Sequence, residues 1–135
     1  MINNECVFDE LDADITADEI LKAINELKMD KSHGPDCLLN EFFIEYKDFI
    51  IPHLCTIFNA VLISGYFPSS WSDAILVPIF KSGDANDAAN YRGISLVSNL
   101  GKLFTTILNK RLLNWATVND ILSDAQFGFR NGYST

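Results

Sequence analysis

Residues 74–97, AILVPIFKSGDANDAANYRGISLV, decide the fold class of this chain. The first seven are apolar and partly β-branched, which is typical of a strand, and residues 92–97 offer a second short strand. The turn residues SGD at 82–84 open a polar loop between them. We therefore expect an antiparallel hairpin. Because Pro78 has no N–H to donate to a sheet, its strand is expected at an edge or at a bulge.

Helical patterns precede the hairpin. Thr16, with Glu19 three positions later, is the signature of a capping box, and the apolar period after it predicts a helix over residues 17–28. Aromatic and aliphatic residues further on predict a short second helix. Pro52 is expected to open a third helix, and Gly65 is well placed to end it.

A long helix is predicted after the hairpin, capped by Ser98 or Asn99. Its period places one apolar side toward a core: Leu100, Leu103, Phe104, Ile107, Leu108, Leu112 and Trp115. The other side carries Lys102, Lys110 and Arg111, which are more often a solvated face than a nucleic-acid track. The chain is thus predicted to be α+β, helix-rich, with a small antiparallel hairpin as its only sheet.

The charge is unevenly distributed along the 135 residues, which are 48% hydrophobic and suffice for one packed domain. Residues 1–67 carry 13 acidic and 4 basic side chains, whereas residues 68–135 carry 5 and 6. The net charge of -8 therefore belongs to the first half. Because proteins that bind nucleic acid on their own are usually basic, this balance argues against strong autonomous binding.

The cysteines suggest neither a zinc site nor a disulfide framework. Cys6, Cys37 and Cys55 are far apart and odd in number, and only His33 and His53 could add nitrogen ligands. Reduced thiols suit an intracellular compartment, with nucleus or cytoplasm left open. The first residues lack the basic and apolar regions of a secretory signal, and no apolar run reaches about 18 residues, so no membrane association is expected.

Catalytic carboxylates are not predicted in this chain. Two-metal nucleotidyl transfer needs acidic side chains close together, and the sequence has no Asp-Asp pair. Asp12 and Asp14 form one D-x-D, but it lies in an acidic lead-in where a solvated role is expected. We therefore predict no catalytic residue and no metal ligand.

Two cations flank the predicted turn. Lys81 follows the first strand and Arg92 starts the second, so both side chains could converge on a phosphate-bearing ligand. From spacing alone the alternative is favoured, in which Lys81 is solvated and Arg92 pairs with Asp84 or Asp87. Arg130 is either a ligand contact or a cap for nearby carbonyls.

Several aromatic residues could stack on nucleic-acid bases. They are Trp71, Phe80, Tyr91, Phe127 and Phe129. Because aromatics between aliphatic residues are more often core, we expect core positions for all of them except Phe129.

As a continuous string, residues 71–112, WSDAILVPIFKSGDANDAANYRGISLVSNLGKLFTTILNKRL, resemble the fingers segment of reverse transcriptases from LINE-type, non-LTR retrotransposons, including the jockey-like group. That family shows W-K-x-A-x-V-x-P-I-x-K-x-G-D, then N-Y-R-P-I-S-L, then G-K-L-x-E-x-x-L-x-x-R-L. Residues 126–135, QFGFRNGYST, are similar to its next block, Q-F-G-F-R-x-G-x-S-T. Residues 31–43 resemble its K-x-x-G-P-D-G loop. The blocks cover residues 16–135 in the family's order.

The resemblance implies the fingers part of a polymerase right-hand fold, with the palm missing. It divides the chain into an acidic flexible lead-in (1–15), a helical N-terminal extension (16–73) and a truncated fingers subdomain (74–135). The family's catalytic aspartates lie downstream of its S-T, so we expect this chain alone to be inactive. The complete parent is an RNA-directed DNA polymerase that would use an RNA template, deoxynucleotides and Mg²⁺, while this chain binds no cofactor.

The resemblance also implies roles for particular residues. In the family, the lysine before the G-D turn and the arginine of N-Y-R are thought to meet the triphosphate of the incoming nucleotide, so Lys81 and Arg92 inherit that role. The block beside nucleotide and template is matched by Gln126, Gly128, Phe129 and Arg130.

Four positions depart from the family pattern. Cys37 replaces the glycine after G-P-D and would be strained if the site requires a positive φ. Gly93 replaces a proline, which loosens the hairpin beside Arg92 by about 1 kcal/mol through the entropy of the unfolded chain. Ser72 and Thr105 stand where lysine and an acid are usual. Such drift fits a decaying element copy.

Two other interpretations stay open. The chain is alternatively a free-standing helical interaction or RNA-binding module derived from such an element, without enzymatic activity. A third interpretation is a nonfunctional gene product. Because its helices would have been selected to pack on a palm, the isolated chain is expected to expose apolar surface and to associate.

Overall fold

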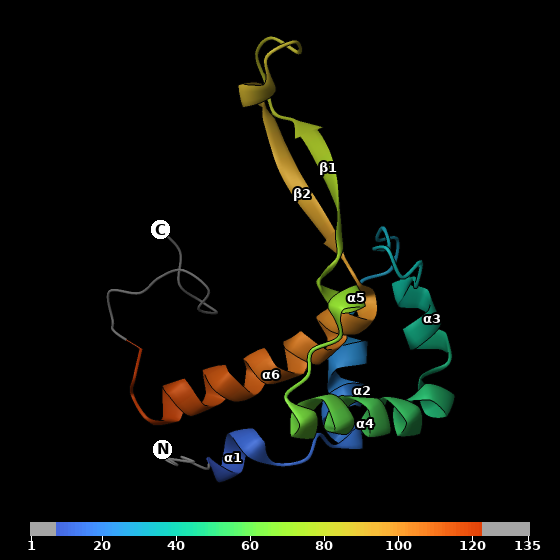
Figure 1. Ribbon diagram of the computed structural model, residues 1–135, viewed down its shortest axis with the longest axis vertical. Helices are drawn as coiled ribbons and strands as arrows, with labels where there is room; N and C mark the ends of the chain where they lie inside the picture. The colour runs from blue at the N-terminus through green and yellow to red at the C-terminus, as the bar shows by residue number, and fades with distance from the viewer. Residues whose placement is uncertain (1–7, 123–135) are drawn as a thin grey trace. The chain divides into compact units, whose positions relative to one another are not determined.

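The computed structural model describes residues 8–122. In chain order these residues form α1 (Asp9–Asp12), α2 (Ala17–Asn25), α3 (Asn40–Glu45), α4 (Lys47–Ser64), α5 (Ser69–Ser72), β1 (Ala74–Phe80), the 3₁₀ turn η1 (Ala88–Asn90), β2 (Tyr91–Val97) and α6 (Asn99–Val118). Helices dominate, and β1 and β2 form a two-stranded antiparallel sheet (Figure 1). The predicted α+β class is confirmed.

The chain divides into two compact units. The larger unit comprises residues 14–107, and the smaller one joins residues up to 13 to those from 108 onward. Helix α6 therefore begins in the larger unit and ends in the smaller one. This division differs in kind from the three segments that the resemblance implies, whose boundaries stay a prediction.

Helix α2 begins with the predicted capping box. The backbone N–H of Glu19 donates to Oγ1 of Thr16 (3.3 Å), and the N–H of Thr16 donates to Oε2 of Glu19 (2.9 Å). The helix ends at Asn25, three residues earlier than predicted, because Leu27 donates to the carbonyl of Ile24 in a tighter turn.

The predicted role of Pro52 is wrong, because this residue lies inside α4 rather than at its start. The helix begins earlier, where Phe49 and Ile50 both donate their N–H groups to the carbonyl of Tyr46. A proline inside a helix lacks one hydrogen bond to the preceding turn, and here that loss is tolerated by the flanking helical residues. Gly65 ends α4 in the left-handed region (φ 64°), as predicted.

The core of the larger unit is formed where α2, α3, α4 and the first part of α6 pack together. Its most buried large side chains are Phe43, Phe58, Ile20, Ile24, Leu103 and Ile107. Trp71 of α5 joins an aromatic cluster there, with ring centroids 6.0 Å from Phe58, 5.6 Å from Phe67 and 5.7 Å from Phe104. Trp71 itself is half-buried, so it lies at the edge of the core rather than within it.

Helix α4 is long and apolar enough to cross a membrane by length and composition alone, the one such helix in residues 8–122. Its Leu54 and Phe58 are buried within the larger unit. Asn59 is tied to the chain before α2, because its side chain accepts from Ile15 N (2.6 Å) and donates to Ile15 O (3.0 Å). These contacts hold one side of α4 on the larger unit, while most residues of the helix remain at least partly exposed.

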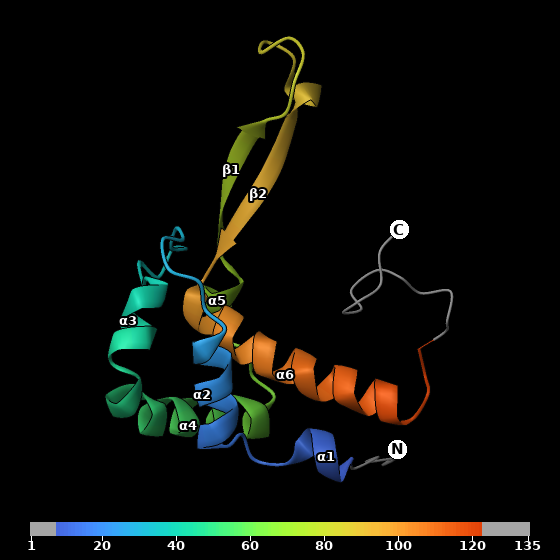
Figure 2. The same cartoon turned by 180° about the vertical axis from the view of Figure 1, so that it is seen from behind.

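The two strands pair over seven residues each without a bulge, from Ala74 opposite Val97 to Phe80 opposite Tyr91. No helix of this unit covers either face of the strands in Figures 1 and 2. Both strands are therefore edges, as Pro78 predicts. The N–H of Lys81 donates to Asn90, so by the antiparallel alternation the pair Pro78–Gly93 is of the non-bonded type, and no ladder bond is lost at the proline.

The smaller unit contains α1 and the end of α6. Arg111 donates to the carbonyls of Leu11 and Ala13, and Phe8 packs edge-on against Trp115 with ring centroids 5.4 Å apart. Two predictions about this stretch of α6 are wrong. Arg111 is half-buried because it binds backbone carbonyls, and the predicted core residue Leu112 is 52% exposed.

Candidate functional site

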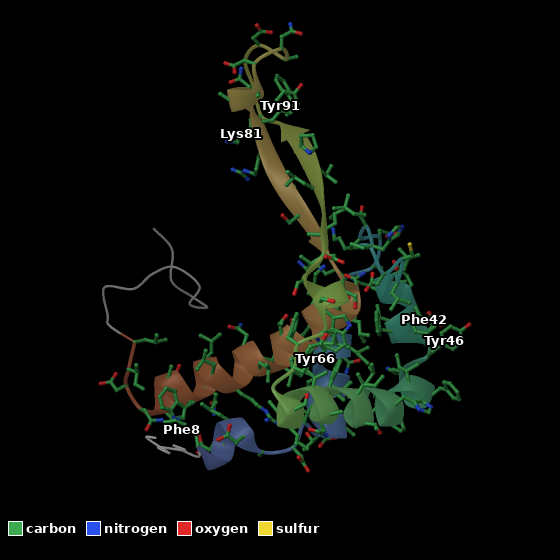
Figure 3. The ribbon with its side chains drawn as sticks, viewed as in Figure 1. Phe8, Phe42, Tyr46, Tyr66, Lys81 and Tyr91 are labelled. Atoms are coloured by element: carbon green, nitrogen blue, oxygen red, sulfur yellow. The ribbon has the colours of Figure 1, made fainter. Side chains whose placement is uncertain are left out.

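By the register of the two strands, Lys81 and Arg92 lie on one face of the hairpin. Figure 3 shows Lys81 near the loop end. Arg92 stands directly opposite Ile79, and the bond from Lys81 N to Asn90 O (2.8 Å) extends the pairing by one residue. Opposite residues share a face, as do residues two apart along a strand. The two cations are therefore diagonal neighbours, which lie roughly 7–8 Å apart in such a pair, with their Cβ atoms somewhat closer.

Both cationic side chains are exposed. The alternative in which Arg92 pairs with an acidic residue of the loop is not seen in the described part of the chain. Oδ1 of Asp84 accepts from the backbone and side chain of Asn86 (2.9 and 3.1 Å), and Oδ1 of Asp87 accepts from Ala89 N (2.9 Å). Because these carboxylates stabilise their own turns, the two cations remain available to a ligand.

The loop between the strands has a defined shape. The hydroxyl of Tyr91 donates to the carbonyl of Ala85 (2.9 Å), and the side chain of Asn90 donates to the carbonyl of Asp84 (2.9 Å). Gly83 has φ 97°, and a Cβ there would lie 2.8 Å from the Asn90 side chain. The turn therefore requires glycine, and its internal bonds fix the end of the hairpin that carries the cations.

The opposite face of the hairpin is apolar. Phe80 and Tyr91 pair with ring centroids 5.4 Å apart, beside an open hollow of about 570 Å³. The hollow is lined by uncharged residues: Leu76, Pro78, Ala85, Asn86, Ala88, Tyr91 and Gly93. The expected core position of Phe80 is wrong, since 45% of it is exposed. Its strand has aliphatic neighbours, but no second layer of this unit covers them.

The remaining predicted site residues lie outside the described residues. These are Gln126, Gly128, Phe129 and Arg130, together with the aromatic Phe127. Their proposed place beside nucleotide and template stays a prediction.

The described residues do not fit a metal centre. Between residues 8 and 122 there is no group of three or more His, Cys, Asp or Glu side chains that could hold an ion. Asp12 of the D-x-D stabilises α1 instead, because its Oδ2 accepts from the backbone N–H of Phe8 (2.8 Å). No metal-dependent step is therefore assigned to these residues.

Cys37 occupies a left-handed position, with φ 55°. The strain expected for a positive φ at this position is therefore present, because a residue with a side chain has a higher free energy in this region than glycine has. Gly93, by contrast, is not in the left-handed region. The family usually has proline at this position. Because residue 93 and Pro78 form a non-bonded pair, a proline at residue 93 would cost no hydrogen bond between the strands.

One contact of the hairpin was missed from sequence. Asp36, in the loop before α3, accepts a hydrogen bond from Ser98, which lies directly after β2. Their 62-residue separation hides the contact from any local pattern. The signal that could have pointed to it is the run G-P-D at residues 34–36, whose glycine and acid both proved to contact the base of the hairpin.

No family model matches the chain. Curated relatives do match, and three of them are aligned with about nine-tenths of it. It is 38% identical over 122 residues to a probable RNA-directed DNA polymerase from transposon BS and 35% identical over 122 residues to the RNA-directed DNA polymerase from mobile element jockey, both of Drosophila melanogaster. It is 33% identical over 127 residues to a retrovirus-related Pol polyprotein from type-1 retrotransposable element R1 of Bradysia coprophila.

The matches cover 90%, 90% and 93% of this chain, but only 14%, 13% and 12% of the length of the three relatives. The match runs through the hairpin and the helices around it. The resemblance inferred from the sequence motifs is thus confirmed. The chain belongs, as the homologue of one segment, to the RNA-directed DNA polymerases of jockey, R1 and other non-LTR retrotransposons.

Proposed function

We propose that this chain is the fingers part of an RNA-directed DNA polymerase and that its hairpin is a flap that binds the incoming deoxynucleotide. The observation that carries the proposal is the placement of Lys81 and Arg92 on one face of the hairpin, both exposed and beside a turn of fixed shape. The polymerase activity for which the relatives are named supports the same assignment.

The chemistry of the two cations fits a triphosphate. Arg92 offers a planar fork of donors that can bind two phosphate oxygens at once, and Lys81 offers a compact positive charge. Two cations on one face of a hairpin neutralise charge on a polyphosphate and orient it. The part of this chain in the reaction is thus to bind and align the nucleotide.

The chemical step is assigned to other residues of the complete polymerase. Nucleotidyl transfer needs Mg²⁺ held between close carboxylates, and residues 8–122 provide no such set. RNA template, deoxynucleotides and Mg²⁺ are therefore proposed for the complete enzyme, and no activity is proposed for this chain alone. An intracellular location without a membrane is part of the same proposal.

Primer extension on an RNA template tests the assignment. The purified chain is compared with the jockey polymerase in which this chain replaces the matched 122 residues. A second graft with Gly83→Val, which the left-handed turn at residue 83 does not accommodate, controls for a correctly formed hairpin. We expect extension by the first graft and little by the control graft or by the chain alone.

Other outcomes discriminate between the alternatives. Extension by the purified chain would contradict the assignment, because its described residues hold no metal-binding carboxylates. A silent graft, combined with specific binding of RNA by the chain itself, would favour the free-standing RNA-binding module. The chain's net charge of -8 argues against that module, since nucleic-acid affinity depends largely on neutralising phosphates.

A further inference from the structure

The loop before α3 lies directly against the base of the hairpin. A Cβ built on Gly34 would be 2.2 Å from the carbonyl oxygen of Val97, the last residue of β2, and 2.8 Å from the nitrogen of Ser98. Backbone is thus packed on backbone with no room for a side chain. The turn is closed by a hydrogen bond from Cys37 N to Gly34 O (3.1 Å).

One carboxylate in this loop binds the junction between β2 and α6 and also the first turn of α6. Oδ2 of Asp36 accepts from the hydroxyl of Ser98 (2.8 Å) and from the backbone N–H of Leu100 (3.3 Å). Its Oδ1 accepts from Leu38 N (3.3 Å), which fixes the carboxylate within its own loop. The negative charge of Asp36 is also favoured by the N–H groups in the first turn of α6, which have no partner within the helix.

The junction itself is buried and specific. Ser98 is 1% exposed, and its hydroxyl also accepts from Gly101 N (3.1 Å), so it serves as the N-cap of α6. Asn99 is 3% exposed and donates to the carbonyl of Leu38 (2.6 Å). These contacts and the Asp36 carboxylate tie this short segment to the loop before α3 and to the first turn of α6.

Ser98 is the one residue between the end of β2 and the start of α6. The start of α6 is itself fixed on the core, because a Cβ on Gly101 would lie 2.8 Å from that of Trp71. The strands beyond the junction are largely exposed and have no covering layer in this unit. The conformation at Ser98, together with that at Asp73 between α5 and β1, therefore sets the direction in which the hairpin leaves the helices.

We propose that Asp36 is a positioning residue for the hairpin: by binding Ser98 and the first turn of α6, it orients the face that carries the two cations. The inference rests on the proposed function, because orientation matters only if that face meets the nucleotide. Asp36 itself lies at the base of the hairpin and contacts the junction, so it acts through Ser98 and touches no nucleotide.

The orientation can be measured in the full chain by the distance between two spin labels. One label is placed on the hairpin loop (Asn86→Cys) and one on α3 (Glu45→Cys), with the natural cysteines replaced. Asp36→Ala is expected to broaden the distance distribution by about two-fold or more, since the bonds holding the junction are lost. Asp36→Asn, which keeps one acceptor oxygen, should recover much of the narrow distribution, and Asp48→Ala on α4 serves as the control.

An unchanged distribution in folded Asp36→Ala would overturn the proposal. If that variant does not fold, Ser98→Ala is measured instead, since it removes the bond from the hydroxyl to Asp36 and the cap bond from Gly101 N but leaves the bond from Leu100 N to Asp36. A broadened distribution is then the expected result, and an unchanged one contradicts the proposal in the same way.

The grafted polymerase separates this inference from the proposed function. We expect Asp36→Ala to raise the deoxynucleotide KM there, as Lys81→Ala does, and Asp36→Asn to restore it. If only Lys81→Ala raises KM, the positioning role is wrong and the nucleotide flap stands. If Lys81→Ala leaves KM unchanged, the flap is wrong, and the distance distribution alone decides whether Asp36 orients the hairpin.

Discussion

The helical part of the larger unit and its hairpin use apolar residues in opposite ways. Phe58 in the helical part is 0% exposed, whereas Leu76 in β1 is 69% exposed. Both stretches are apolar in sequence, but only the first buries its side chains within the chain. A two-stranded ribbon alone is marginally stable in water, so the hairpin's stability depends on its turn and its base.

The exposed apolar surface also extends over the helices. Further exposed examples are Phe49 and Ile63 on α4, Phe42 on α3, and Tyr46 between these two helices. Figure 3 labels Phe42 and Tyr46. The expected exposure of apolar surface is thus confirmed for residues 8–122. Self-association of the isolated chain stays a prediction, with sedimentation as its measurement.

The largest predicted effect contrasts these two regions in one pair of variants. Phe58→Ala should lower the free energy of unfolding by about 3–5 kcal/mol, because it leaves a cavity in the aromatic core. Leu76→Ala should change it by less than about 0.5 kcal/mol, because the side chain is already in water. Urea unfolding followed by circular dichroism measures both. Equal losses would show that the hairpin is part of the cooperative core.

The next effect concerns the left-handed residue beside Asp36. Cys37→Gly should stabilise the chain by up to about 1 kcal/mol, because glycine removes the strain at φ 55° and restores the residue usual in the family. Cys55→Gly, inside α4, is the matched control and should destabilise. A loss of stability in Cys37→Gly would mean that the cysteine side chain makes a contact worth more than the strain.

A smaller effect is expected within the hairpin itself. Gly93→Pro should slow local opening of β1 and β2 by reducing the freedom of the open chain, a gain of roughly 0.4–1 kcal/mol. A Cβ at residue 93 meets only the Leu76 side chain, whose nearest atom is 3.0 Å away. Amide hydrogen exchange on the strand residues measures it. Faster exchange in the proline variant would contradict the register given above.

The smallest effect separates the regions by pH. A hydrogen bond from Asp30 N (2.6 Å) holds the pKa of Glu41 below its ordinary value of 4.5. A lowered folded pKa contributes stability above the unfolded pKa, and this is lost as pH falls through the folded value. Melting of α3 should therefore become easier in acid, and this change should be smaller in Glu41→Gln. Amide hydrogen exchange of the hairpin, corrected for its intrinsic pH dependence, should not follow the same titration.

Local patterns predicted the elements well. The capping box of Thr16, the strand over residues 74–80 and the glycine end of α4 all act through neighbours within a few residues. Pro52 was misjudged because a proline is tolerated in both the first turn of a helix and, at a cost, further inside. The start of α4 was decided by Tyr46 upstream.

Contacts between distant residues could not be predicted in this way. The bond between Asp36 and Ser98 spans 62 residues, and the placement of Leu112 in water depends on which elements cover the end of α6. For the site, the two cations were predicted from the hairpin pattern and the family motif. That they share a face followed only from the register of the two strands. The sequence alone does not determine this register, because it does not give the conformation of the loop that joins the strands.

The central claim is tested most directly by the deoxynucleotide KM of the grafted polymerase. Lys81→Ala and Arg92→Ala should each raise KM by about ten-fold or more, since hydrogen bonds to charged groups contribute roughly 1.5–3 kcal/mol. Lys22→Ala on α2, an exposed lysine far from the hairpin in sequence, should leave KM unchanged. An unchanged KM in both hairpin variants would contradict the nucleotide flap.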